Sequence, residues 1–188
     1  MITALTTFQQ WLLLSGTLVV VGCVAWRVLV MSRALKVLSA ENATAITHIE
    51  QRVASLGLTS VGVLFVAWTL RLVVQVMAFR DPFVPLQYDI SFLLFEIFWG
   101  TVWIAQGVIL ALLAGALWLA VRRSRSTSGA SQPEDRVVLN AVWAVAMPLV
   151  GTLAATLAMS GHAIGVDTAR TLAVTADATH TLAAGGWL

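Results

Sequence analysis

The stretch WLLLSGTLVVVGCVAWRVLV, residues 11–30, decides the fold of this chain. Its only charged residue is Arg27, near the end of the run. About twenty apolar residues, each rising about 1.5 Å along a helix, are enough to cross the hydrocarbon core of a bilayer. Residues 11–30 are therefore predicted to form a transmembrane helix.

The composition extends this prediction to the whole chain. Hydrophobic residues make up 59% and charged residues 11% of the sequence, whereas about a quarter of the residues of a soluble domain are charged. The formal net charge of +2 is small, which argues against nucleic acid as a partner and for the lipid bilayer. We expect an all-α fold, a polytopic transmembrane helix bundle of about five spans that forms one domain over 1–188. The expected spans are residues 11–30, 56–79, 92–121, 137–159 and 171–188.

Three polar segments separate the first four of these spans. Residues 32–52 carry charges among spaced apolar positions, which predicts an amphipathic helix at the membrane surface. Residues 80–89 contain two prolines and are predicted to form a loop, because proline cannot continue a helix. Residues 122–136, rich in serine and charge, are predicted to be a flexible linker.

The charges of these loops orient the predicted bundle. The loops after the first and third spans each hold three or four basic residues, whereas the two other loops each hold one arginine beside acidic residues. Basic residues close to span ends are retained in the cytoplasm. The N-terminus and the loop that contains His162 are therefore predicted to be extracytoplasmic.

One charge lies in the middle of a predicted span. Arg71 interrupts the second span, and Gln75 follows it by one helical turn on the same face. An arginine inside the membrane needs a partner or a water-filled cavity. Glu96, near the start of the third span, is the expected partner, so a structural ion pair between Arg71 and Glu96 is predicted.

Other polar or aromatic residues are predicted to be structural. Cys23 is expected to be a small buried hydrophobic residue, since it is the only cysteine and lies within the first span. His48 is expected to be a solvated surface histidine. Trp99, Trp103 and Trp118 are expected to anchor the third span at the membrane interface.

The last thirty residues hold the candidate metal ligands. Met159 and His162 are three residues apart, as are Asp177 and His180, so each pair shares a helix face if the helices extend that far. Thioether and imidazole together suit copper, Cu(I) especially, and Asp177 is placed to hold the second ring nitrogen of His180. Structural hydrogen bonding and a proton relay are the alternatives that these residues leave open.

The same residues carry a resemblance to a family. The segment Ser160-Gly-His162-Ala, then His180-Thr-Leu-Ala-Ala-Gly-Gly-Trp187-Leu188, together with FWGTVWIAQGVILAL from Phe98 onward, resembles bacterial copper-resistance membrane proteins of the CopD/PcoD type. The likeness covers the chain from about residue 92. It implies a multi-pass protein of the bacterial inner membrane that moves copper across the membrane or transfers it, beside a small periplasmic copper carrier. His162 and His180 are the positions that carry over.

The chain also departs from the family pattern. Relatives commonly have a histidine in the first span, where this chain has Trp11-Leu-Leu-Leu-Ser-Gly, and they continue for about three more spans. We therefore expect the sequence to correspond to the amino-terminal part of the family's length. Two alternatives to copper handling stay open: an electron-transfer subunit in which histidines bind haem b, and a non-catalytic structural subunit associated with other membrane subunits. No enzyme is expected, because the sequence contains no nucleophile elbow, phosphate loop or paired carboxylates.

Overall fold

The computed structural model describes residues 2–33, 43–126, 133–160 and 169–187, and the regular structure in these ranges is entirely helical. The elements in chain order are α1 (Ile2–Ala25), its wider π-helical continuation η1 (Trp26–Met31), α3 (Ala43–Phe79), α4 (Leu86–Ser91), the π-helical turn η3 (Phe92–Glu96), α5 (Phe98–Ser126), α6 (Pro133–Met159) and α7 (Arg170–Trp187). The predicted all-α class is confirmed.

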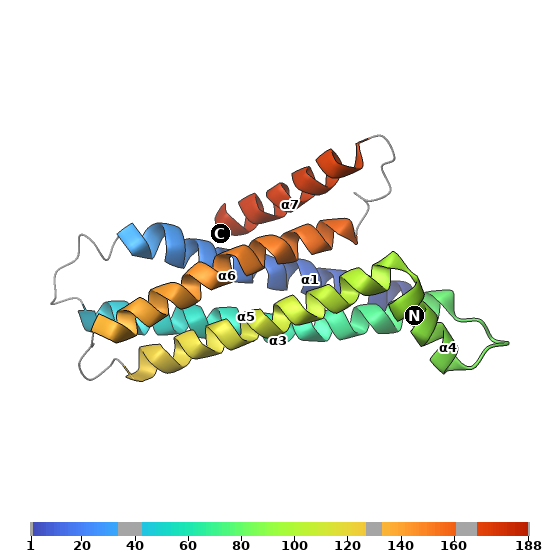
Figure 1. Ribbon diagram of the computed structural model, residues 1–188, viewed down its shortest axis with the longest axis horizontal. Helices are drawn as coiled ribbons and strands as arrows, with labels where there is room; N and C mark the ends of the chain where they lie inside the picture. The colour runs from blue at the N-terminus through green and yellow to red at the C-terminus, as the bar shows by residue number, and fades with distance from the viewer. Residues whose placement is uncertain (1, 34–42, 127–132, 161–168, 188) are drawn as a thin grey trace.

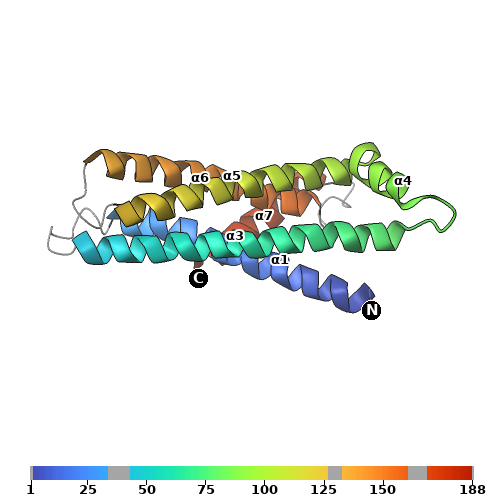
Figure 2. The same cartoon turned by 90° about the horizontal axis from the view of Figure 1, so that it is seen from below.

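The four longest helices run along the long axis of the molecule (Figure 1), with α1 and α3 on one side and α5 and α6 on the other (Figure 2). Each packs against the next in the chain, and the shorter α7 returns to pack on α1 and α6. The core between them is built from aliphatic side chains of α1, α3 and α5 and the fully buried Trp143 of α6. The chain is a polytopic helix bundle.

Four of these helices are long and apolar enough to cross a membrane: Ile2–Met31, Ala45–Phe79, Phe98–Arg125 and Arg136–Met159. Less than half of each apolar stretch is buried inside the protein, so each helix presents a large apolar surface that the bundle does not cover. Water disfavours such a surface and lipid favours it. The protein is therefore a multi-pass membrane protein. The fifth expected span, 171–188, forms α7, but α7 is not among the four helices.

Helices α1 and α3 begin well before the expected positions, and α6 begins at Pro133 instead of residue 137, within the predicted linker. α1 starts at Ile2, and the hydroxyls of Thr6 and Thr7 find acceptors in the carbonyls four residues before them, so these polar side chains are accommodated in the helix. α3 starts at Ala43, so the described part of the predicted surface helix is the first part of α3. That prediction was wrong because Glu50 is buried against the bundle rather than exposed on the membrane surface.

The third span begins later than expected. The backbone at Ile97 is extended, which separates η3 from α5, so the helix starts at Phe98 instead of residue 92. The turn folds η3 back onto the start of α5, where Gly100 donates to the Ile97 carbonyl over 3.0 Å. A Cβ at Gly100 would lie 2.2 Å from the Leu93 oxygen, so only glycine permits this approach.

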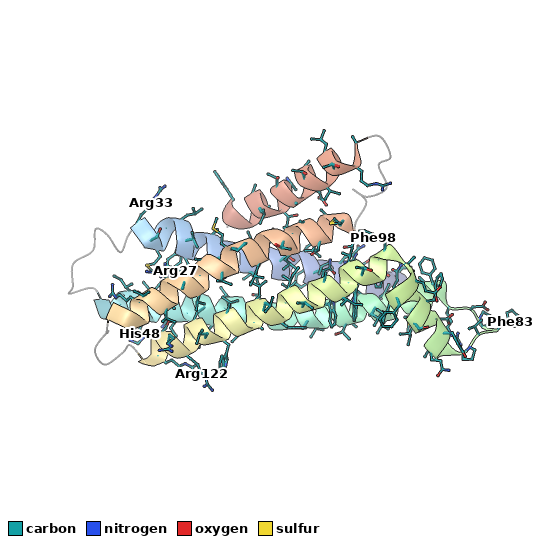
Figure 3. The ribbon with its side chains drawn as sticks, viewed as in Figure 1. Arg27, Arg33, His48, Phe83, Phe98 and Arg122 are labelled. Carbon is teal, nitrogen blue, oxygen red and sulfur yellow. The ribbon has the colours of Figure 1, made fainter. Side chains whose placement is uncertain are left out.

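Several basic residues lie at one end of the bundle. Arg27, Arg33, His48 and Arg122 gather at one end, and Phe83 and Phe98 at the other (Figure 3). His48 is exposed and Cys23 is buried, as expected for a surface histidine and a small hydrophobic residue. Trp118 is 47% exposed and lies under the Arg122 guanidinium, consistent with an interfacial anchor.

Candidate functional site at the end of helix α6

The intramembrane Arg71 of α3 binds the end of α6. Its Nη1 donates to the Ser160 hydroxyl over 3.0 Å, and its Nη2 donates to the Ser160 carbonyl over 2.8 Å. The last carbonyls of a helix lack intrahelical donors and lie at the negative end of the helix dipole. The half-buried Arg71 guanidinium therefore supplies hydrogen-bond donors to the end of α6, and the negative end of the helix dipole stabilises its charge.

Gln106 of α5 completes the same contact. Its side chain is only 2% exposed, and its Nε2 donates to the Thr156 carbonyl over 3.1 Å and to the Ser160 hydroxyl over 3.2 Å. Its Oε1 accepts from Arg71 over 3.4 Å. Three helices are thus joined at one level by neutral acceptors and one cation.

A pair of stacked tryptophans lies beside this polar cluster. Trp68 and Trp103 stack with ring centroids 3.9 Å apart, and each indole N–H donates to the backbone carbonyl of the other residue. A Cβ at Gly107 would lie 2.6 Å from the Trp68 ring, so glycine makes room for the stack. Trp99 lies one turn closer to the start of α5, with its ring centroid 5.8 Å from the Arg71 Cζ.

The predicted ion pair between Arg71 and Glu96 is not formed. The Glu96 side chain is exposed, and the ion pairs among the described residues are Arg27–Glu50 and Arg80–Asp89. The reason is the break at Ile97, which places Glu96 on η3 instead of on the inner face of α5. Arg71 binds Ser160 and Gln106 instead.

The expected copper ligands that the structure describes lie on two helices, α6 and α7. Met159 is the last residue of α6 and is half-buried, while His162 lies outside the described residues. His180 and Asp177 are both exposed on α7, and no hydrogen bond joins their side chains. Within the described ranges, no group of three or more His, Cys, Asp or Glu side chains gathers in the way a metal ion requires.

A second buried polar cluster lies near the other end of the bundle. The Arg27 Nε donates to the Glu50 carboxylate, and its Nη2 donates to the Asn140 Oδ1 over 2.9 Å. Arg27 and Glu50 are 4% and 6% exposed, and the Arg27 Cζ lies 5.9 Å from the centre of the Trp143 ring. The ion pair links η1 to α3, and the Asn140 hydrogen bond links η1 to α6. These contacts hold the helices together at this end of the bundle.

Sequence reasoning missed several of these residues. Trp68 was not singled out, and Trp103 was expected to be an interfacial anchor rather than half of a stacked pair. A usable signal was present: Trp68 and Arg71 on α3 have the same three-residue spacing as Trp103 and Gln106 on α5. Two helices with one pattern of an aromatic and a polar residue were candidates to face each other.

Comparison of the chain with protein-family models, with curated proteins and with solved structures gives no match.

Proposed function

We propose that the protein handles copper in the bacterial inner membrane, binding the ion at the extracytoplasmic mouth between α6 and α7. Met159 and His162 are the proposed ligands at this mouth, and His180, about 15 Å along α7, is the proposed ligand at which the ion is exchanged. Sulfur and imidazole donors favour Cu(I) over hard cations such as magnesium or calcium. The resemblance to copper-resistance membrane proteins supports the same assignment, with a small periplasmic copper carrier as the expected partner.

The observation that carries this proposal is the fixed position of Ser160. This residue follows Met159 directly and precedes His162 by two positions. Arg71 holds both its hydroxyl and its carbonyl, and Gln106 holds its hydroxyl as well. Hydrogen bonds that orient the backbone beside a metal ligand improve metal affinity, because the ligand residues then lose less conformational freedom when the metal binds.

The exposure of His180 suits transfer rather than storage. His180 lies ten residues into α7, or about 15 Å along it, on a face that the bundle does not cover. An imidazole on an open face is accessible to an ion delivered by another protein. His180 is accordingly proposed to exchange copper with the carrier.

Copper titration of the full chain, purified in detergent under reducing and anaerobic conditions, tests the proposal. We expect about one Cu(I) per chain in competition with a chelator, and at least tenfold weaker binding in His180→Ala and in Met159→Leu. His48→Ala is the matched control, because it removes an exposed histidine at the opposite end of the bundle. Equal binding by His180→Ala and the parent protein would exclude His180 as a ligand.

A structural subunit of a larger membrane complex is the second candidate, and the outer face of α7 favours it. The exposed residues Asp177 and His180 are three positions apart and form a polar face on a helix that packs against α1 and α6. Lipid disfavours such a face, so another protein chain is a suitable cover. The absence of bound copper, with no Soret absorption from haem b, would favour this candidate.

A further inference from the structure

The Arg71 guanidinium retains an unused pair of donors. Arginine has five N–H groups in a planar fork. Ser160 accepts one N–H of Nη1 and one N–H of Nη2, and Gln106 accepts the second N–H of Nη1. The two left over are Nε–H and the second Nη2–H, which lie parallel on one edge of the guanidinium. Such an edge matches the two oxygens of a carboxylate or a phosphate.

Among the described residues, the charge of Arg71 has no counter-charge beside it. Among the described residues no carboxylate lies within ion-pair distance of it, because the acids that form ion pairs are Glu50 and Asp89. The other buried arginine, Arg27, differs in having both a carboxylate and an amide acceptor. A cation in a membrane span is unfavourable without an anion or water beside it. Arg71 is therefore suited to an anion from outside the chain.

A second unsatisfied donor lies level with Arg71. Gln9 of α1 is 4% exposed, and its Nε2 is buried without a hydrogen-bond partner. The close approaches of Gly16 to Leu64 and of Gly57 to Cys23 set the register of the antiparallel helices α1 and α3. Gln9 precedes Gly16 by seven residues and Arg71 follows Leu64 by seven. Because both helices rise about 1.5 Å per residue, the two side chains share one level.

This level is close to the edge of the hydrocarbon core. Arg71 lies eight residues, or about 12 Å, from the end of α3, and Gln106 lies the same distance from the start of α5. The span Phe98–Arg125 has 28 residues. This span is about 42 Å long, and the hydrocarbon core of a bilayer is about 30 Å thick. A centred span therefore extends about 6 Å beyond the core at each end. The donors then lie about 6 Å inside the boundary, within reach of a headgroup drawn inward.

We propose that Arg71 and Gln9 form a binding site for a phosphate group, supplied either by an anionic phospholipid headgroup or by a free phosphate ion. The Nε and Nη2 edge of Arg71 binds two phosphate oxygens, and the Gln9 amide donates to a third acceptor position. This site goes beyond the copper proposal. It takes a ligand of opposite charge, and its donors come from α1 and α3, where Arg71 uses the edge that does not bind Ser160.

Thermal unfolding of the full chain in detergent, followed by tryptophan fluorescence, tests the site. One arm adds dioleoylphosphatidylglycerol, with dioleoylglycerol as the control that lacks the phosphate. The other arm adds sodium phosphate, with sodium chloride at equal ionic strength as its control. We expect a saturable rise of the unfolding midpoint. A rise with the phospholipid alone identifies a headgroup site, and a rise with sodium phosphate identifies a free-anion site.

Two variants and a matched control connect this effect to the site. Arg71→Gln removes the charge and the free edge, and we expect it to raise the half-saturating concentration at least tenfold. Gln9→Leu removes an amide that has no partner, so the variant is expected to fold and to raise that concentration at least threefold. Gln10→Leu replaces the neighbouring exposed glutamine and is expected to leave the half-saturating concentration unchanged. The proposal is overturned if neither phosphate source raises the midpoint, or if Gln9→Leu responds as the parent does.

Discussion

Trp68 and Trp103 bind each other twice, since each indole N–H donates to the other residue's backbone carbonyl while the rings stack 3.9 Å apart. A tryptophan in an apolar helix needs an acceptor for its N–H, and a helix backbone seldom offers one. Here each helix supplies the acceptor for the other. The pair therefore fixes both the rotation and the register of α3 against α5, and with them the relative positions of Arg71 and Gln106.

Trp68→Phe tests this pair directly. The change removes one hydrogen bond, leaves the Trp103 carbonyl without its donor and weakens the stack, so we expect a loss of about 1–3 kcal/mol in the free energy of unfolding. Trp103→Phe should act similarly, and the double variant should lose less than the sum of the two. Denaturant unfolding in mixed micelles measures all three. Trp118→Phe, at an exposed position, is the control, and additive losses would show that the two rings act independently.

The buried ion pair between Arg27 and Glu50 predicts an asymmetry between single and double variants. Glu50→Gln leaves Arg27 as a buried cation without a counter-charge, which we expect to reduce the free energy of unfolding by about 3–5 kcal/mol. Changing both residues to methionine removes the two charges together and should recover most of that stability. Asp89→Asn, in the pair with the more exposed Arg80, should cost less than Glu50→Gln. A double variant no more stable than Glu50→Gln would contradict this account.

Two adjacent glycines at the end of α7 should differ sharply. A Cβ at Gly185 would lie 2.5 Å from the Val21 Cβ, whereas one at Gly186 would lie 3.8 Å from the Ala25 Cβ. Gly185→Ala should therefore displace α7 from α1 and lower the free energy of unfolding by about 1–3 kcal/mol. Gly186→Ala should be neutral or stabilise the helix by up to about 1 kcal/mol. Hydrogen exchange along α7, with the unfolding midpoint, measures both, and equal damage from the two changes would show that α7 is not seated on α1 as described.

The predicted orientation is tested by labelling. Phe83 is 93% exposed between α3 and α4, and His48 is exposed at the other end of the bundle (Figure 3). Single cysteines at these two positions, in a Cys23→Ala background, should react oppositely with a membrane-impermeant maleimide added to intact cells. The basic loops predict that Phe83→Cys reacts and His48→Cys is protected. The reverse pattern would place the end of α6 in the cytoplasm and require copper to be loaded from within.

Much of the fold is determined by the sequence alone. Long apolar runs, each interrupted by few charges, specify helices that span a bilayer, because hydrocarbon leaves the backbone no hydrogen-bond partners except its own. The sequence also predicted the burial of Cys23 and the exposure of His48, because Cys23 lies in an apolar run and His48 lies in a charged segment.

Only the tertiary structure decided the partners of the intramembrane charges. Arg71 binds Ser160, which is 89 residues away, and not the nearer Glu96, because the extended backbone at Ile97 takes Glu96 off the inner face of α5. Arg27 pairs with Glu50 because the polar residues before the second span continue α3 into the bundle instead of lying on the membrane surface. A charge in the sequence shows that a partner is needed, but the partner is chosen by which helix faces meet, and that depends on packing across the whole bundle.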